Sequence, residues 1–151
     1  MTIFNRIKNA VLSGADDLTT GVAKFRNKKF MEGTVAVCAI ISMASDGASA
    51  SEKQKMIGFI QQSKELSVFD VNDVIKFFNK LVDGFSFDQD IGKGEAMKYV
   101  VLLKDKPESA QLALRVGIAV AKSDGDFDPE ERKVACNICA VLGFNPADYQ
   151  L

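Results

Sequence analysis

The spacing of apolar residues along the chain predicts helices. Between residues 71 and 84, apolar side chains recur at steps of three and four, the period of an amphipathic helix: Val71, Val74, Ile75, Phe78, Leu81 and Val82. The segment 29–45 is almost continuously apolar from Val35 to Ala44, which predicts a helix buried on most sides. Similar patterns predict helices over 3–26, 51–63, 94–104, 107–123 and 129–142, with Pro107 in a first turn and Gly143 as a stop.

Strand signals are weak by comparison. No two β-rich runs are joined by turn residues, and the short β-leaning piece "VFDV" is too brief to build a sheet. We therefore expect an all-α fold, a compact bundle of about seven helices that forms a single domain over residues 1–151.

Two segments share one pattern at a constant offset of 78 residues. "MASDGASASEK" (43–53) aligns with "AKSDGDFDPEE" (121–131), and the match extends outward to Ile40 with Ile118 and Ile60 with Ile138. This repeat predicts an internally duplicated helical hairpin, with copies at about 29–63 and 107–141. If the copies pack face to face through their apolar helices, their acidic loops lie at one end of the domain.

Helix capping explains part of the second acidic loop. Asp128, Pro129, Glu130 and Glu131 form a strong helix start, with an acidic N-cap, a proline at the first position and carboxylates in the first turn. In the first copy, a serine can cap and Glu52 lies in the first turn.

Capping does not explain Asp46 and Asp124. Each follows a predicted helix, where a carboxylate meets the negative end of the helix dipole. A hard divalent cation prefers oxygen ligands and would offset this repulsion. The loop is not an EF-hand, because glycine is second rather than sixth and Ala135 stands at position twelve. Two interpretations remain open, a metal site and solvated helix caps.

A third acidic stretch, "FSFDQDIGKGE" (85–95), contains Asp88, Asp90 and Glu95. It could border the two repeated loops, or it could be a helix start capped by Asp90 or a nearby group. Its "GKG" lacks the spacing of a phosphate-binding loop.

Composition excludes several functions. The net charge of −1 excludes a generally basic nucleic-acid binder, although residues 1–40 carry six basic and three acidic side chains while 41–151 carry thirteen and seventeen. Apolar runs fall short of the roughly 20 residues of a membrane span, and the start does not resemble a signal peptide, so we expect a cytoplasmic protein. The chain contains no histidine, which removes histidine-activated nucleophiles and imidazole zinc sites.

Three cysteines, Cys38, Cys136 and Cys139, are an odd number and too few for a disulfide scaffold. "CNIC" (136–139) places two thiols one helical turn apart, where they could bind a soft metal or meet an oxidant. More often such cysteines are small core residues. Against thiol chemistry, the pair lies inside a predicted helix rather than at its N-terminus.

Several blocks follow one another along the chain: "NKKFMEGTVAVCA", "SEKQKMIGFI", "VIKFFNKLV", "IGKGEAMKY", "AQLALRVGIAVAKSDGDFD" and the final "LGFNPADY". Together, these blocks resemble the TerB family of bacterial tellurite-resistance operons. The resemblance covers essentially the whole chain. It implies a seven-helix cytoplasmic domain with no established enzymatic activity, associated with resistance to tellurite, some phages and pore-forming colicins.

The resemblance also implies a site and partners. Acidic residues of the two loops would form a metal-binding cluster, here Asp46, Glu52, Asp124 and Glu130, with Asp126, Asp128 and Glu95 as additions. Ala50 stands where the second copy has Asp128, so the two half-sites could differ. We expect calcium, magnesium or manganese as the metal.

We expect other Ter proteins as partners, including the membrane protein TerC at the inner face of the membrane. The N-terminal helix or "NKK" (27–29) would dock. We also expect a monomer that binds no nucleic acid. The alternative function is a thiol-based protein that captures or reduces tellurite through Cys136 and Cys139.

Overall fold

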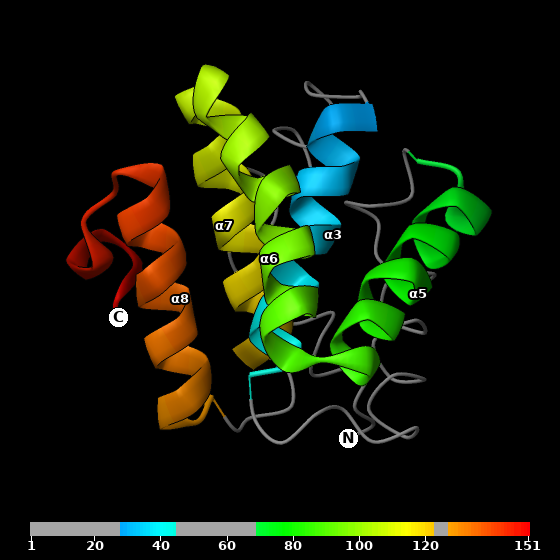
Figure 1. Cartoon of the computed structure of the whole chain (residues 1–151). Coiled ribbons are helices and arrows are strands. Elements are labelled where there is room, and N and C mark those ends of the chain that lie inside the picture. The colour runs from blue at the N-terminus through cyan, green and yellow to red at the C-terminus, as the bar shows by residue number, and fades with distance from the viewer. Residues whose placement is uncertain (1–27, 45–68, 123–126) are drawn as a thin grey trace, which may run out of the picture.

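The structure is a computed structural model that describes residues 28–44, 69–122 and 127–151. Within these ranges the chain is helical and contains no strand, as the hydrophobic pattern predicts. The elements are α3 (Lys28–Ser42), α5 (Val71–Phe87), α6 (Gln89–Val101), the 3₁₀ helix η1 (Leu102–Asp105), α7 (Pro107–Lys122), α8 (Pro129–Leu142) and the 3₁₀ helix η2 (Pro146–Tyr149) (Figure 1).

Helix α3 is the centre of the bundle. It contacts α5, α6, α7 and α8, and between Phe30 and Ile41 only Glu32 is not buried. A helix that is apolar all round is stable only when neighbours cover every side. The prediction of a helix buried on most sides is therefore confirmed.

Helices α3 and α7 are the first helices of the two predicted repeats, and they pack closely. Gly117 of α7 lies against the Val37 side chain of α3 so tightly that a Cβ at this position would clash. The predicted helices 3–26 and 51–63 lie outside the described residues. The count of seven helices and the superposition of two hairpins therefore stay predictions.

Helices α5 and α6 meet at a corner of one residue. Asp88 ends α5 and also caps α6, where its side chain accepts a hydrogen bond from the Ile91 backbone N–H at 3.0 Å. The sequence predicted that α5 ends near Gly84 and that the next helix begins near Gly94. Both boundaries were wrong, because α5 continues to Phe87 and the Asp88 cap starts α6 at Gln89.

The start of α8 confirms the predicted cap. Asp128 Oδ1 accepts from the Glu131 N–H at 2.8 Å, and Glu131 Oε1 accepts from the Asp128 N–H at 3.2 Å, forming a capping box around Pro129. Gly143 ends the helix in the left-handed region, with φ of 80°. These local bonds fix where the second acidic loop gives way to helix.

Each helix begins or finishes at one of the two ends of the bundle. At the lower end in Figure 1, α3 and α7 finish while α6 and α8 begin. At the upper end, α3 begins and the chain passes from α6 through η1 into α7. Both predicted acidic loops connect to the lower end, since one follows α3 and the other joins α7 to α8.

Candidate functional site

A groove lies at the lower end of the bundle, between the end of α3 and the starts of α6 and α8. Its volume is about 230 Å³. Apolar residues form one part of its lining: Ile40, Met43, Ala44, Phe85 and Val134. Polar residues from the N-terminal parts of α6 and α8 form the other: Gln89, Asp90, Lys93, Glu130, Lys133 and Asn137.

Glu130 is the predicted ligand that lines this groove. It is exposed in the first turn of α8, and Asp90 from the first turn of α6 lines the same groove. Ala44, the last described residue before the first acidic loop, lines it as well. The groove is therefore lined by Glu130 of the second repeat, by Asp90 of the third acidic stretch and by Ala44, which precedes the first acidic loop.

Four predicted ligands, Asp46, Glu52, Asp124 and Asp126, lie outside the described residues. Asp128 is described, and it is the N-cap of α8, one turn before the groove-lining Lys133 and Val134. One of its carboxylate oxygens accepts from the Glu131 N–H. The capping interpretation therefore holds for Asp128.

Glu95 lies on α6 but does not line the groove. Its Oε1 accepts a hydrogen bond from Lys98 at 2.9 Å, and both side chains are exposed. This hydrogen bond and the charge of Lys98 lower the pKa of the Glu95 carboxyl, with a smaller contribution from Lys80 of α5. Glu95 is therefore paired with Lys98 of its own helix and does not line the groove.

Asp90 is the groove residue that the sequence interpretation had treated mainly as a helix cap. The cap of α6 is Asp88, so the Asp90 carboxylate in the first turn does not cap the helix. A signal was present in the sequence, since acidic residues start both α6 and α8. Two such helices that begin at the same end bring their first-turn carboxylates together.

The groove does not form a complete metal site by itself. Within residues 28–44, 69–122 and 127–151, no group of three Asp, Glu, His or Cys side chains could hold an ion. Lys93 and Lys133 place two positive charges beside Asp90 and Glu130. A divalent cation here would need further carboxylates, because calcium takes six to eight oxygen ligands.

Cys139, one member of the cysteine pair, lies in a poor environment for thiol chemistry. Cys139 is buried, and burial raises its pKa to about 11, with a further contribution from Cys136. Burial also raises the pKa of Cys38 to about 12. Because the thiolate is the reactive form, neither buried thiol is poised as a nucleophile at neutral pH.

The fold and groove define a class, a small helical domain whose polar groups meet in an open groove at one end of the bundle. Among the described residues, no helix is both long enough and apolar enough to cross a bilayer. The described residues that line the groove supply carboxylates, lysines and amides, and none of them carries a thiol or a hydroxyl nucleophile.

Comparison with known proteins identifies the family. The family model described as "Tellurite resistance protein TerB" matches residues 31–151. The "Tellurium resistance protein TerB" of Alcaligenes sp is 63% identical over 118 residues, which cover 78% of this chain and 97% of that protein. The chain therefore belongs to the TerB family of tellurite resistance proteins. No solved structure matches it.

Proposed function

We propose that the chain acts in tellurite resistance as a non-enzymatic binding module that holds a divalent cation at the lower end of the bundle. The observation that carries the proposal is the groove that Asp90 and Glu130 share beside Ala44. Oxygen ligands from three segments distant in sequence would then converge on one cation. A hard cation would relieve the repulsion among them.

The ligand set of this proposal extends the groove with the acidic loops. Asp46 and Glu52 of the first loop and Asp124 and Glu130 of the second are the principal ligands, with Asp126, Asp128 and Asp90 as neighbours that complete the coordination. Glu95 is the least favoured of the predicted ligands, since it is paired with Lys98. An internal duplication of the helical hairpin within seven helices would supply the two loops symmetrically.

Calcium, magnesium and manganese are the proposed ions. Carboxylates and carbonyls are the preferred ligands of these hard cations. The absence of histidine from the sequence argues against zinc bound through imidazole.

The proposed setting is the cytoplasm, at the inner face of the membrane beside other Ter proteins including TerC. Membership of the TerB family supports this setting. The family is described by resistance rather than by a reaction, which supports a binding role.

Titration of calcium, magnesium and manganese into the full-length chain tests the metal proposal. We expect saturable binding by calorimetry below millimolar metal, with backbone amide shifts around Asp90 and Glu130. The double variant Asp46→Ala with Asp124→Ala should lose binding. Glu130→Gln alone should weaken it at least about tenfold, because one anionic ligand is lost.

A matched control removes two carboxylates elsewhere. Asp73→Ala with Asp148→Ala changes the net charge equally, and both residues are exposed and outside the groove. This control should bind metal as the wild type does. If the wild type shows no saturable binding, or if the control loses binding equally, the acidic loops are helix caps only.

A further inference from the structure

A second hollow lies at the opposite, upper end of the bundle. The start of α3, helix η1 and the start of α7 line it, and its volume is about 370 Å³. The lining residues are Lys28, Lys29, Phe30, Leu102, Leu103, Lys106 and Ser109. The metal proposal does not use any of them.

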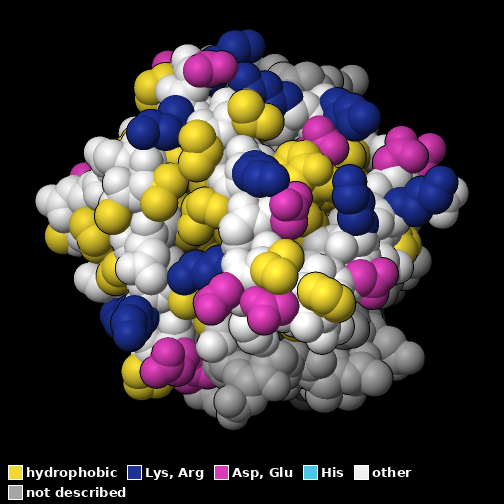
Figure 2. Space-filling model, in the orientation of Figure 1, with side chains coloured by type: hydrophobic (Ala, Val, Ile, Leu, Met, Phe, Trp, Pro, Cys, Tyr) yellow, Lys and Arg dark blue, Asp and Glu magenta, His cyan; other side chains and the backbone are white. Residues whose placement is uncertain are grey.

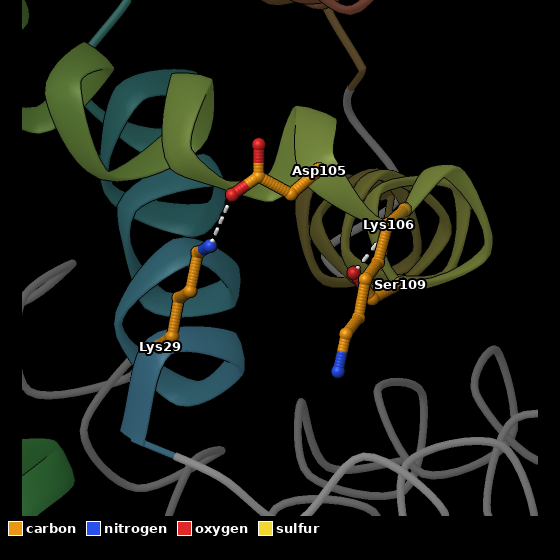
Figure 3. A network of polar contacts seen from close by, with 4 residues as sticks. All are labelled: Lys29, Asp105, Lys106 and Ser109. Carbon is orange, nitrogen blue, oxygen red and sulfur yellow. Dashed lines mark hydrogen bonds and ion pairs between the residues drawn. The ribbon is translucent and has the colours of Figure 1, made fainter.

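Of the three lysines that line this hollow, Lys29 is paired with a carboxylate. Lys29 Nζ donates to Asp105 Oδ2 at 2.8 Å, across from α3 to η1 (Figure 3). Lys106 carries its amine away from Asp105, while its backbone carbonyl accepts from Ser109 Oγ at 2.8 Å. Within the described part of the chain, the amines of Lys28 and Lys106 have no carboxylate partner. Two exposed ammonium groups are therefore available to an anion.

The surrounding charge favours an anion as well. The segments 28–29 and 102–109 carry four lysines against two carboxylates. One of the two, Asp105, is already paired with Lys29.

Apolar side chains accompany this charge. Phe30 and Leu103 are buried beneath the hollow, whereas Leu102 at its edge is 51% exposed and the adjacent Val101 is 43% exposed. In Figure 2, lysine and hydrophobic side chains lie side by side at the upper end, and carboxylates are interspersed there and over the rest of this face. The two kinds of side chain together match an amphiphile whose anionic head and apolar body are adjacent.

We propose that this basic hollow, formed by Lys28, Lys106 and Leu102, docks the protein directly onto an anionic phospholipid surface. The phosphodiester of a lipid headgroup would pair with the two lysine amines, and Leu102 with Val101 would enter the interfacial layer. A free anion would leave the exposed apolar residues unused. The groove with Asp90 and Glu130, at the opposite end of the bundle, would then face away from the membrane.

Vesicle flotation with the full-length chain, in EDTA and at low salt, tests this docking. We expect binding to phosphatidylcholine vesicles that contain phosphatidylglycerol and none to phosphatidylcholine alone. Lys28→Gln with Lys106→Gln should lower the partition constant about thirtyfold, the equivalent of about 1 kcal/mol per lysine near an anionic surface. Leu102→Ser should weaken binding as well, and added salt should weaken it by screening.

The matched control is Lys76→Gln with Lys80→Gln, which changes the net charge equally on the exposed face of α5. Its partition constant should fall by less than about threefold, because these lysines lie away from the hollow. The proposal is overturned if the wild type binds vesicles with phosphatidylglycerol no better than vesicles without it. It is overturned as well if the partition constant of the control falls as much as that of the test pair. It is also overturned if inorganic phosphate alone shifts the amides of residues 28 and 106 and releases the protein from vesicles. EDTA keeps this result independent of the metal site.

Discussion

At the scale of single residues, the acidic side chains fall into two groups. Some accept a hydrogen bond from a backbone N–H at a helix start, and others line the groove. Asp88 and Asp128 each accept a hydrogen bond from an N–H in the first turn of the following helix. Such a cap stabilises its helix by about 1 kcal/mol whether or not a metal binds. Asp90 and Glu130 come after the caps and line the groove instead. Neighbouring carboxylates in one acidic stretch therefore have different tasks.

Removal of the cysteine pair tests the alternative, thiol-based function. Cys136→Ala with Cys139→Ala should leave tellurite resistance of cells intact, because the buried Cys139 has a pKa of about 11 and is not a thiolate at neutral pH. We expect a loss of about 1 kcal/mol or more in the free energy of unfolding from the packing that the sulfurs provided. The measurement is growth in tellurite beside an immunoblot of protein level.

Cys38→Ala is the control for that experiment, since it removes a buried sulfur from α3 rather than from the pair. A complete loss of resistance in the double variant, at normal protein level and with Cys38→Ala still resistant, would establish thiol chemistry instead.

At the scale of elements, glycine sets how closely the helices approach. Gly92 of α6 lies against the backbone of α5, and a Cβ there would stand 2.5 Å from Phe85 Cα and 2.7 Å from Gly84 C. This approach holds the first turn of α6, with Asp90, against the end of α5. The groove therefore depends on a residue that has no side chain.

Gly92→Ala should destabilise the protein by about 1–3 kcal/mol, because the added methyl group meets backbone atoms that cannot move aside. Urea unfolding followed by far-UV circular dichroism measures the change. Gly94→Ala is the matched control in the same helix, where a Cβ meets nothing within 4 Å. It should raise stability by up to about 1 kcal/mol through helix propensity. Equal effects of the two variants would show that packing against α5 is unimportant.

At the scale of the whole molecule, the groove and the basic hollow lie at opposite ends of the bundle. The exposed large apolar residues of the described part flank α6, with Phe87 and Ile91 at its start and Val101 and Leu102 at its end. The lower end carries the groove with Asp90 and Glu130, and the upper end carries the basic hollow. A cation and a lipid surface would thus be held at opposite poles.

This separation predicts a monomer in solution. Small apolar groups at two distant ends do not supply the extended apolar surface that a stable homodimer buries. Size-exclusion chromatography with light scattering should give a mass near 16.4 kDa, with and without calcium. A concentration-independent mass of twice that value would contradict the prediction and would point to an interface through one of the two ends.

The sequence by itself determined the all-helical character of the described residues, the Asp128 cap and the buried character of α3. Each depends on interactions within a few residues: the apolar period along one turn, a side chain that meets a nearby N–H, or a run of apolar positions. The repeat at an offset of 78 further predicted that the acidic loops share one end. The family resemblance was also readable from ordered blocks of residues, and the comparisons confirmed it.

Only the tertiary structure decided which side chains meet. Asp90 and Glu130 are 40 positions apart, and they line one groove because α6 and α8 begin at the same end of the bundle. Glu95 lies on the same helix as Asp90, yet it pairs with Lys98 and does not line the groove. The basic hollow likewise joins Lys28 to Lys106 across the start of α3 and the start of α7. Rotation and depth of packing between helices fix such encounters, and they depend on close approaches at Gly92 and Gly117 that a local pattern does not encode.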